Sequence, residues 1–118
     1  MGIMMRRLAG GIIGLAVLGG VAGAQTPDPK QVAAGKKLYD TLKCATCHMA
    51  EAKGNKKLPL DGIGKKMPAA QIRSWIASPA EMEAKLDKKP AVKMSSMMKT
   101  KLSDPDVDAL VAYVQSLK

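Results

Sequence analysis

The chain has 118 residues, with 19 Lys and Arg against 10 Asp and Glu, so its formal charge is +9. This length suffices for one small domain and leaves no room for two. One histidine and two cysteines exclude a zinc site made of four Cys and His ligands from one chain, and exclude a second histidine ligand to any metal. With three aromatic residues and no Phe, the core is expected to need filling by something other than side chains.

Residues 1–24 have the pattern of a secretory signal peptide. Two arginines precede an apolar stretch, which ends in small residues. This pattern predicts cleavage after Ala24, a mature domain of residues 25–118 and a periplasmic location. Loss of the two arginines leaves 17 of the 19 basic residues against 10 acidic ones, a charge of +7. The alternative is a retained anchor, although the 17 apolar residues from 8 to 24 are at the short limit for spanning a bilayer and include six glycines.

The first predicted helix runs from Pro29 to about Lys43. Asp28 is suited to the N-cap, and proline is favoured at the first helical position. Apolar residues at helical spacing predict one helical face, made of Val32, Ala33, Leu38, Tyr39 and Leu42. Gly35, in the middle of this helix, costs about 1 kcal/mol relative to alanine. A close crossing with another helix at Gly35 would justify that cost.

The middle of the chain is predicted to hold short helices and long loops. Residues 49–66 form a loop rich in lysine, glycine and proline. Short helices are predicted from Pro68 to Ala77 and from Pro79 to about Leu86, since proline is favoured in a first helical turn. Residues 88–101 form a second loop, which carries three methionines among lysines.

The last helix is the clearest in the sequence. Ser103 is suited to the N-cap, and Asp106 follows three residues on, as in a capping box. Acidic residues in the first turn also suit the positive end of the helix dipole. The buried stripe is predicted to contain Val107, Leu110, Val111, Val114 and Leu117, with Tyr113 beside it. Because no segment shows sustained alternation of β-branched residues, the sequence predicts an all-α domain.

The motif Cys44-Ala45-Thr46-Cys47-His48 carries the chemistry. Two thiols separated by two residues can each bond to one vinyl group of a haem, and the histidine that follows then supplies the proximal iron ligand. Thioether-linked haem requires an exported chain, which agrees with the predicted signal. Three alternatives remain. One is a thioredoxin-like dithiol without its usual strand–helix context, another is a disulfide across this short loop, and the third is a zinc site without a fourth strong ligand.

Together these features resemble the class I mono-haem cytochromes c, in particular small bacterial ones, over residues 29–118. The resemblance implies an all-α class I cytochrome c fold, in which the first and last helices cross and short middle helices and loops surround one covalently bound haem c. At the crossing, Gly35 and Tyr39 are expected to pack against Leu110 and Tyr113. The segment Leu58-Pro59-Leu60-Asp61-Gly62 is similar to the family's proline-containing loop.

That loop and the pocket walls complete the expected haem site. The resemblance implies that the carbonyl oxygen of Pro59 accepts a hydrogen bond from the second ring nitrogen of His48. A haem would also supply the missing core, since several hundred square ångströms of apolar surface contribute on the order of 10 kcal/mol. Candidate pocket walls are Trp75, Ile72, Ile76, Leu60 and Ile63.

Met94 is predicted to be the sixth iron ligand. With one histidine in the chain, the distal face needs methionine, lysine, an exogenous ligand or none. The resemblance places the ligand in the loop before the last helix, and Met94 lies 46 residues after His48 and nine before Ser103. Met97 is then expected to pack inward and Met98 to face elsewhere. Met97 is the alternative ligand.

Lysines flank the loops that are expected to surround the pocket. They are Lys53, Lys56, Lys57, Lys65, Lys66, Lys88, Lys89, Lys93, Lys99 and Lys101. Such a positive rim is expected to steer a redox partner with an acidic surface, whereas nucleic acid is not expected because no aromatic residues are interleaved for base stacking.

The sequence therefore predicts a monomeric, non-enzymatic, periplasmic electron carrier that uses one haem c, with His48 and Met94 as axial ligands. It would meet a membrane only through partners or an uncleaved signal. The alternatives are a gas-binding or sensing protein with an open sixth position, and a haem subunit of a larger respiratory or dehydrogenase complex.

Overall fold

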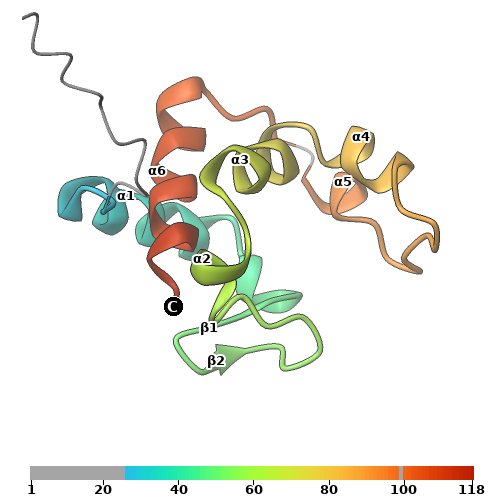
Figure 1. Cartoon of the computed structure of the whole chain (residues 1–118), viewed down its shortest axis with the longest axis horizontal. Coiled ribbons are helices and arrows are strands. Elements are labelled where there is room, and N and C mark those ends of the chain that lie inside the picture. The colour runs from blue at the N-terminus through green and yellow to red at the C-terminus, as the bar shows by residue number, and fades with distance from the viewer. Residues whose placement is uncertain (1–25, 99) are drawn as a thin grey trace, which may run out of the picture.

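The described chain consists of helices joined by loops, with one very short hairpin. The computed structural model describes residues 26–98 and 100–118, and the predicted signal segment with its cleavage site lies outside these ranges. In chain order the elements are α1 (Pro29–Thr41), the 3-10 turn η1 (Cys44–Thr46), β1 (Met49–Ala50), β2 (Lys53–Gly54), α2 (Ile63–Lys66), α3 (Ala69–Ala77), α4 (Pro79–Ala84), α5 (Met94–Met97) and α6 (Asp104–Ser116) (Figure 1). The all-α prediction is confirmed. Among the described residues, no helix is both long and apolar enough to span a bilayer.

Three short elements are absent from the sequence-based prediction. The loop predicted over residues 49–66 contains the antiparallel hairpin β1–β2 and helix α2, and the loop predicted over 88–101 contains α5. Each is too short to produce a hydrophobic period in the sequence. Contacts with distant parts of the chain must therefore hold them.

Both long helices begin at the predicted caps. The Asp28 carboxylate accepts a hydrogen bond from the N–H of Lys30 at 2.8 Å, and the Ser103 hydroxyl accepts one from the N–H of Asp106 at 3.3 Å. Helix α1 ends slightly before the predicted Lys43, because that residue adopts a φ of 56° and turns the chain into η1. This turn places the Cys44–His48 motif directly after α1.

Helices α1 and α6 cross in close contact, and Figure 1 shows the crossing. A Cβ atom at Gly35 would overlap the carbonyl oxygen of Ala109 and lie 2.7 Å from the Cβ of Tyr113. The rings of Tyr39 and Tyr113 meet edge to face, with their centroids 5.4 Å apart. The crossing expected at Gly35 is confirmed, and it explains why glycine stands in the middle of a helix.

Gly35→Ala is expected to lower the free energy of unfolding by about 2 kcal/mol, because the added methyl forces the two helices apart. Helix propensity alone predicts a gain of about 1 kcal/mol from the same change. The exposed Ala34 provides the control, since Ala34→Gly should follow propensity and destabilise the protein by about 1 kcal/mol. Denaturant unfolding of the holoprotein measures both. A stable Gly35→Ala variant would contradict the close crossing.

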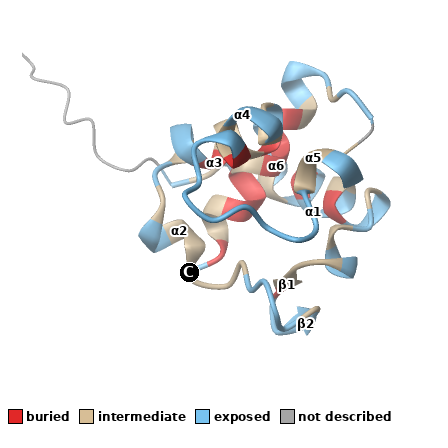
Figure 2. Cartoon of the chain, turned by 90° about the vertical axis from the view of Figure 1, so that its right-hand side faces the viewer, coloured by how far each residue is buried: buried red, intermediate tan, exposed pale blue. Residues whose placement is uncertain are grey.

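The core lies between α1, α3 and α6, where Figure 2 shows the buried residues in red. Tyr113, predicted to lie beside the buried stripe of α6, is buried within it, whereas Val111 is only partly buried. The edge of the core is closed by Arg73 of α3, which forms ion pairs with Asp108 and Asp104 of α6. Several apolar residues that pack against this core, such as Leu60, Ile63 and Met67, are only partly buried. The core is therefore open on their side.

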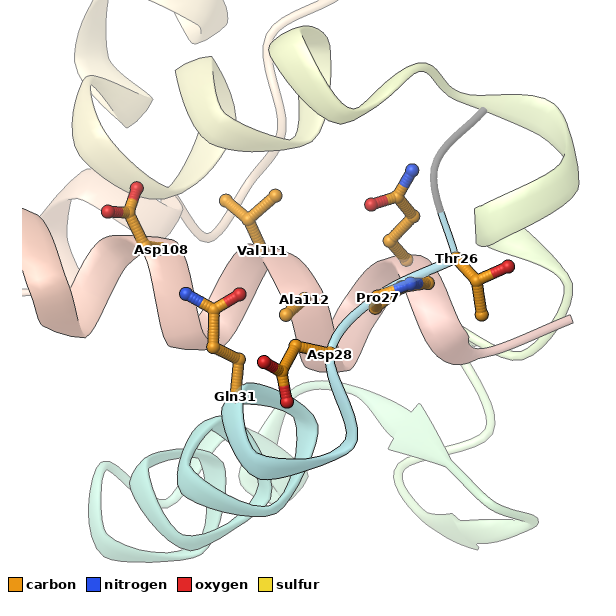
Figure 3. Close-up of a pocket in the computed structure, with 8 residues that line it drawn as sticks. Thr26, Pro27, Asp28, Gln31, Asp108, Val111 and Ala112 are labelled. Carbon is orange, nitrogen blue, oxygen red and sulfur yellow. The ribbon is translucent and has the colours of Figure 1, made fainter. Parts of the chain in front are cut away.

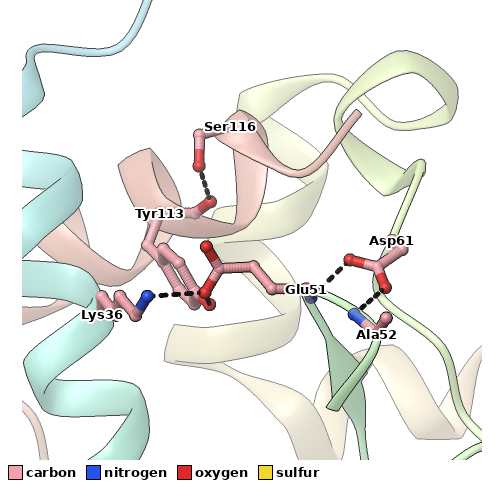
Figure 4. Close-up of polar contacts among 6 residues, drawn as sticks. All are labelled: Lys36, Glu51, Ala52, Asp61, Tyr113 and Ser116. Atoms are coloured by element: carbon pink, nitrogen blue, oxygen red, sulfur yellow. Dashed lines mark hydrogen bonds and ion pairs between the residues drawn. The ribbon is translucent and has the colours of Figure 1, made fainter.

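Two carboxylates, those of Glu51 and Asp61, hold the hairpin in place (Figure 4). Its central residues, Glu51 and Ala52, have φ values of 51° and 59°, which is typical of a type I′ turn. The Asp61 carboxylate compensates for this backbone strain by accepting hydrogen bonds from both N–H groups, at 2.7 and 2.8 Å. The Glu51 carboxylate pairs with Lys36 of α1 at 2.8 Å and accepts a hydrogen bond from the hydroxyl of Tyr113 of α6 at 3.0 Å. These contacts hold the pKa of Glu51 below its ordinary value, with the bond from Lys36 as the largest cause.

Ala52→Gly is expected to raise the free energy of unfolding by about 1 kcal/mol, because glycine adopts a positive φ without a steric penalty. Asp61→Ala should lower the free energy of unfolding, since it leaves the two N–H groups of the turn without their acceptor. Denaturant unfolding of both variants gives the comparison. Destabilisation by Ala52→Gly would show that the turn carries no strain.

Candidate functional site

The motif Cys44–His48 lies where the chain turns from α1 towards the hairpin. The backbone N–H of His48 donates to the carbonyl oxygen of Cys44 at 2.9 Å, and the hydroxyl of Tyr39 donates to the carbonyl oxygen of His48 at 3.3 Å. These bonds bring Cys44 and His48 to the wall of one cavity. Cys47 is half-buried at the end of η1 and is not part of that wall; both thiols are free.

This cavity has a volume of about 340 Å³ and an almost entirely apolar wall. The structure brings every wall residue expected from the sequence to it: Leu60, Ile63, Ile72, Trp75 and Ile76. Helix α6 adds Leu110 and Val114, and the chain between α4 and α6 adds Leu86, Pro90, Val92, Met94 and Met98. Segments far apart in the sequence thus enclose one apolar space beside the cysteine–histidine motif.

Several apolar side chains on this wall are open to solvent. Leu58 is 53% exposed, Leu86 38% and Val92 66%. Large apolar side chains gathered around one opening indicate a binding surface. A flat apolar group seated in the cavity would cover them and would complete the core. The cavity and its Cys–His donor set therefore fit a haem.

His48 is held in the tautomer that an iron ligand requires. Its Nδ1 donates a hydrogen bond to the carbonyl oxygen of Leu58 at 3.2 Å, which leaves the lone pair on Nε2 free. Burial lowers the pKa of His48, partly offset by the Leu58 bond, so the neutral ring is favoured.

The acceptor for His48 differs from the expected one, because it is the carbonyl of Leu58 and not that of Pro59. The backbone N–H of Met49 also donates to the Leu58 carbonyl, at 3.1 Å, and the N–H of Leu60 donates to the Met49 carbonyl at 2.7 Å. This pairing sets the register of the loop, and it turns the Leu58 carbonyl towards the histidine. Pro59 itself is exposed. A carbonyl acceptor has no side-chain signature, so no sequence signal identified Leu58.

The three loop methionines are arranged differently from the prediction. Met94 and Met98 both line the cavity, whereas Met97 is 58% exposed and does not. The expectation that Met97 packs inward and Met98 faces elsewhere is wrong. The reason is that residues 94–97 form the helix α5, whose spacing of four places positions 94 and 98 on one side.

The sequence did not predict the buried position of Glu83, beside the segment that carries Met94. It is buried in α4, and its carboxylate accepts hydrogen bonds from the residue directly after Met94. A buried glutamate in a short helix has no distinguishing pattern in one sequence, because most glutamates lie on the surface.

A second cavity, of about 320 Å³, lies between the residues ahead of α1 and one face of α6 (Figure 3). Its wall is largely polar and includes Thr26, Gln31 and Gln115. Its two carboxylates are already engaged, since Asp28 caps α1 and Asp108 pairs with Arg73. It contains no residue of the haem motif or of the first cavity.

Comparison with known proteins agrees with this geometry. A sequence model described as cytochrome c matches residues 32–118. Among curated proteins, the chain is similar to the cytochrome bc1 complex cytochrome c subunits of Mycobacterium bovis and Mycobacterium tuberculosis. The identity is 29% over an alignment of 128 positions. The alignment covers 96% of this chain and 42% of each relative, so the chain spans less than half of their length. No solved structure matches the chain.

The family match covers most of the described domain, including both crossing helices and the Cys44–His48 motif. The chain belongs to the class I cytochrome c family, an all-α fold with covalently bound haem c.

Proposed function

We propose that this protein is an exported one-electron carrier whose haem is bonded to Cys44 and Cys47 and held between His48 and Met94. The observation that carries the proposal is that His48 and Met94, 46 residues apart in the chain, line the same apolar cavity. Haem supplies an iron that alternates between the ferrous and ferric states. A thioether opposite an imidazole favours the ferrous state, which suits a carrier of high potential.

The protein's own groups hold His48 in place. The bond from His48 Nδ1 to the Leu58 carbonyl orients the ring and raises the basicity of Nε2. Tyr39, in turn, holds the backbone of His48 through its hydroxyl. A histidine held in this way would keep its position in both iron states, which would limit the rearrangement that accompanies electron transfer.

The rim of the cavity supports docking with an acidic redox partner. The exposed Leu58 and Val92 mark the open edge, and exposed lysines such as Lys56 and Lys57 lie beside it in the sequence. Lys89, predicted as part of the rim, has another role, because its ammonium group donates to three backbone carbonyls. Lys99 lies outside the described residues.

Electron transfer with an acidic partner is expected to slow by about tenfold or more as the Debye length falls from about 30 to 10 Å with rising salt. Lys56→Gln/Lys57→Gln should weaken this dependence, because both lysines are next to Leu58 at the cavity edge. The matched control is Lys30→Gln/Lys37→Gln, which removes the same charge from α1. Stopped-flow kinetics gives the rates. Equal effects of the two double variants would contradict a docking role for the rim.

Optical spectroscopy of the purified protein tests the proposed ligands. A pyridine haemochrome should show thioether-bound haem, and the ferrous protein should resist carbon monoxide because both axial positions are filled. Ready binding of carbon monoxide would instead support a gas-binding or sensing protein with an open sixth position.

A second candidate is a haem subunit of a larger respiratory complex. It is supported by the relatives, which are subunits of a cytochrome bc1 complex and are more than twice as long as this chain. Size-exclusion chromatography of a mild membrane extract separates the two candidates, since a free carrier should elute as a monomer. Mass spectrometry of the exported protein should find Gln25 as its first residue if the proposed signal is removed; an intact N-terminus would favour an anchored subunit.

A further inference from the structure

Glu83 stands out as the only buried charged residue in the described part of the chain. It is 4% exposed, although it lies in the short helix α4 near the surface. Its carboxylate accepts a hydrogen bond from the backbone N–H of Ser95 at 2.8 Å and another from the Ser95 hydroxyl at 2.6 Å. These two donors hold the pKa of Glu83 below its ordinary value. Each of the two carboxylate oxygens thus accepts a hydrogen bond from one residue twelve positions further along the chain.

The chain between these two residues is closed by a second contact. The ammonium group of Lys89 donates to the carbonyl oxygens of Glu83, Ala84 and Leu86, at 3.1, 2.7 and 2.8 Å. Two of these carbonyls, those of Glu83 and Ala84, belong to the last turn of α4, where a helix leaves carbonyl groups short of partners within the helix. Lys89 thus secures the start of the connecting loop, and Glu83 secures its end. We call the contacts of Glu83 and Lys89 the loop clasp.

The loop clasp contacts helix α5, which has few other stabilising contacts of its own. Helix α5 has only four residues, so it cannot be stable alone, and no side chain at its own N-cap bonds to it. Glu83 supplies that missing acceptor from α4. Ser95, which donates both hydrogen bonds to Glu83, directly follows Met94, and the side chain of Met94 lines the haem cavity.

We propose that Glu83 is the positioning residue of the distal ligand, holding Met94 over the cavity through Ser95. The inference rests on the proposed ligation by Met94. Glu83 is not part of the cavity wall, and it acts by fixing the backbone on which Met94 stands. A charged acceptor suits this task, because bonds to an ionised group are shorter and stronger than bonds between neutral groups.

The test is a competition for the iron by added imidazole in the oxidised holoprotein. Imidazole must displace the methionine, so its affinity reports how firmly Met94 is held. Glu83→Ala should tighten imidazole binding at least about tenfold and weaken the far-red sulfur-to-iron band. Glu83→Gln should change the affinity less, since the amide oxygen still accepts one bond from Ser95.

Two further variants separate positioning from charge and from folding. Glu81→Ala removes the same charge from an exposed site on the same helix and should leave imidazole affinity unchanged. Ser95→Ala removes one of the two donors and keeps Glu83, so it should tighten imidazole binding by an intermediate factor even if Glu83→Ala folds poorly. Limited proteolysis should also cut the segment 85–93 faster in Glu83→Ala than in Glu81→Ala.

Failure of this inference differs from failure of the proposed ligand. Loss of the far-red band in Met94→Ala, together with wild-type imidazole affinity in both Glu83→Ala and Ser95→Ala, overturns only the role of Glu83. Equal tightening in Glu81→Ala also overturns it, since charge alone would then explain the effect. Survival of the band in Met94→Ala overturns both assignments.

Discussion

The double variant Cys44→Ala/Cys47→Ala is expected to carry no covalent haem and to lose cooperative folding. Haem burial contributes on the order of 10 kcal/mol before costs, which is comparable to the whole stability of a small domain, about 5–15 kcal/mol. Three large apolar residues of the cavity wall, Leu58, Leu86 and Val92, are exposed to solvent. The haem-free chain therefore has an incomplete core.

Two measurements check this result. Haem staining of the denatured protein reports covalent attachment, and thermal unfolding followed by circular dichroism reports cooperativity. Replacement of the exposed Thr46, between the two cysteines, by alanine is a control that keeps both thiols and should keep both haem and fold. A cooperatively folded, stable chain without haem would contradict the view that the cofactor completes the core.

The second large effect is expected for Met94→Ala. It should abolish the far-red sulfur-to-iron band, open the ferrous protein to carbon monoxide, and lower the reduction potential by at least about 100 mV. The direction follows because a thioether ligand stabilises the ferrous state, and axial ligands set haem potentials over about 0.8 V. Absorption spectra and a redox titration measure these changes.

The neighbouring methionines provide matched controls. Met97 is exposed, so Met97→Ala should change neither the band nor the potential. Met98 lines the cavity beside Met94, so Met98→Ala is expected to alter packing and leave the band in place. Loss of the band in Met98→Ala, and its survival in Met94→Ala, would assign the ligand to Met98 and leave the electron-carrier proposal intact.

Local chemistry in the sequence was enough to predict the main framework. Asp28 and Ser103 cap the long helices as expected, since a cap depends on a side chain and the backbone within three residues of it. Gly35 marked the helix crossing because a glycine inside a helix is unfavourable unless another backbone comes close. The spacing of Cys44, Cys47 and His48 pointed to haem, which agrees with the family match.

The details of the ligand surroundings were decided by tertiary structure. The hydrogen-bond acceptor of His48 is the carbonyl of Leu58 and not the predicted one of Pro59, because pairing with Met49 sets the register of the loop. The sequence could not distinguish the two, since every residue has the same carbonyl group. Met98, and not the predicted Met97, faces the cavity, because residues 94–97 form a four-residue helix. This helix is too short to show a hydrophobic period in the sequence.

Glu83 illustrates the same limit most clearly. The sequence by itself determined the fold class, the caps at the start of both long helices and the haem motif, because each depends on residues close together in the chain. Only the folded chain brings Glu83 to Ser95, and only there does a buried carboxylate find two donors. A contact between residues twelve positions apart, across a loop without a hydrophobic period, leaves no pattern in the sequence, since its energy arises only when the two ends meet.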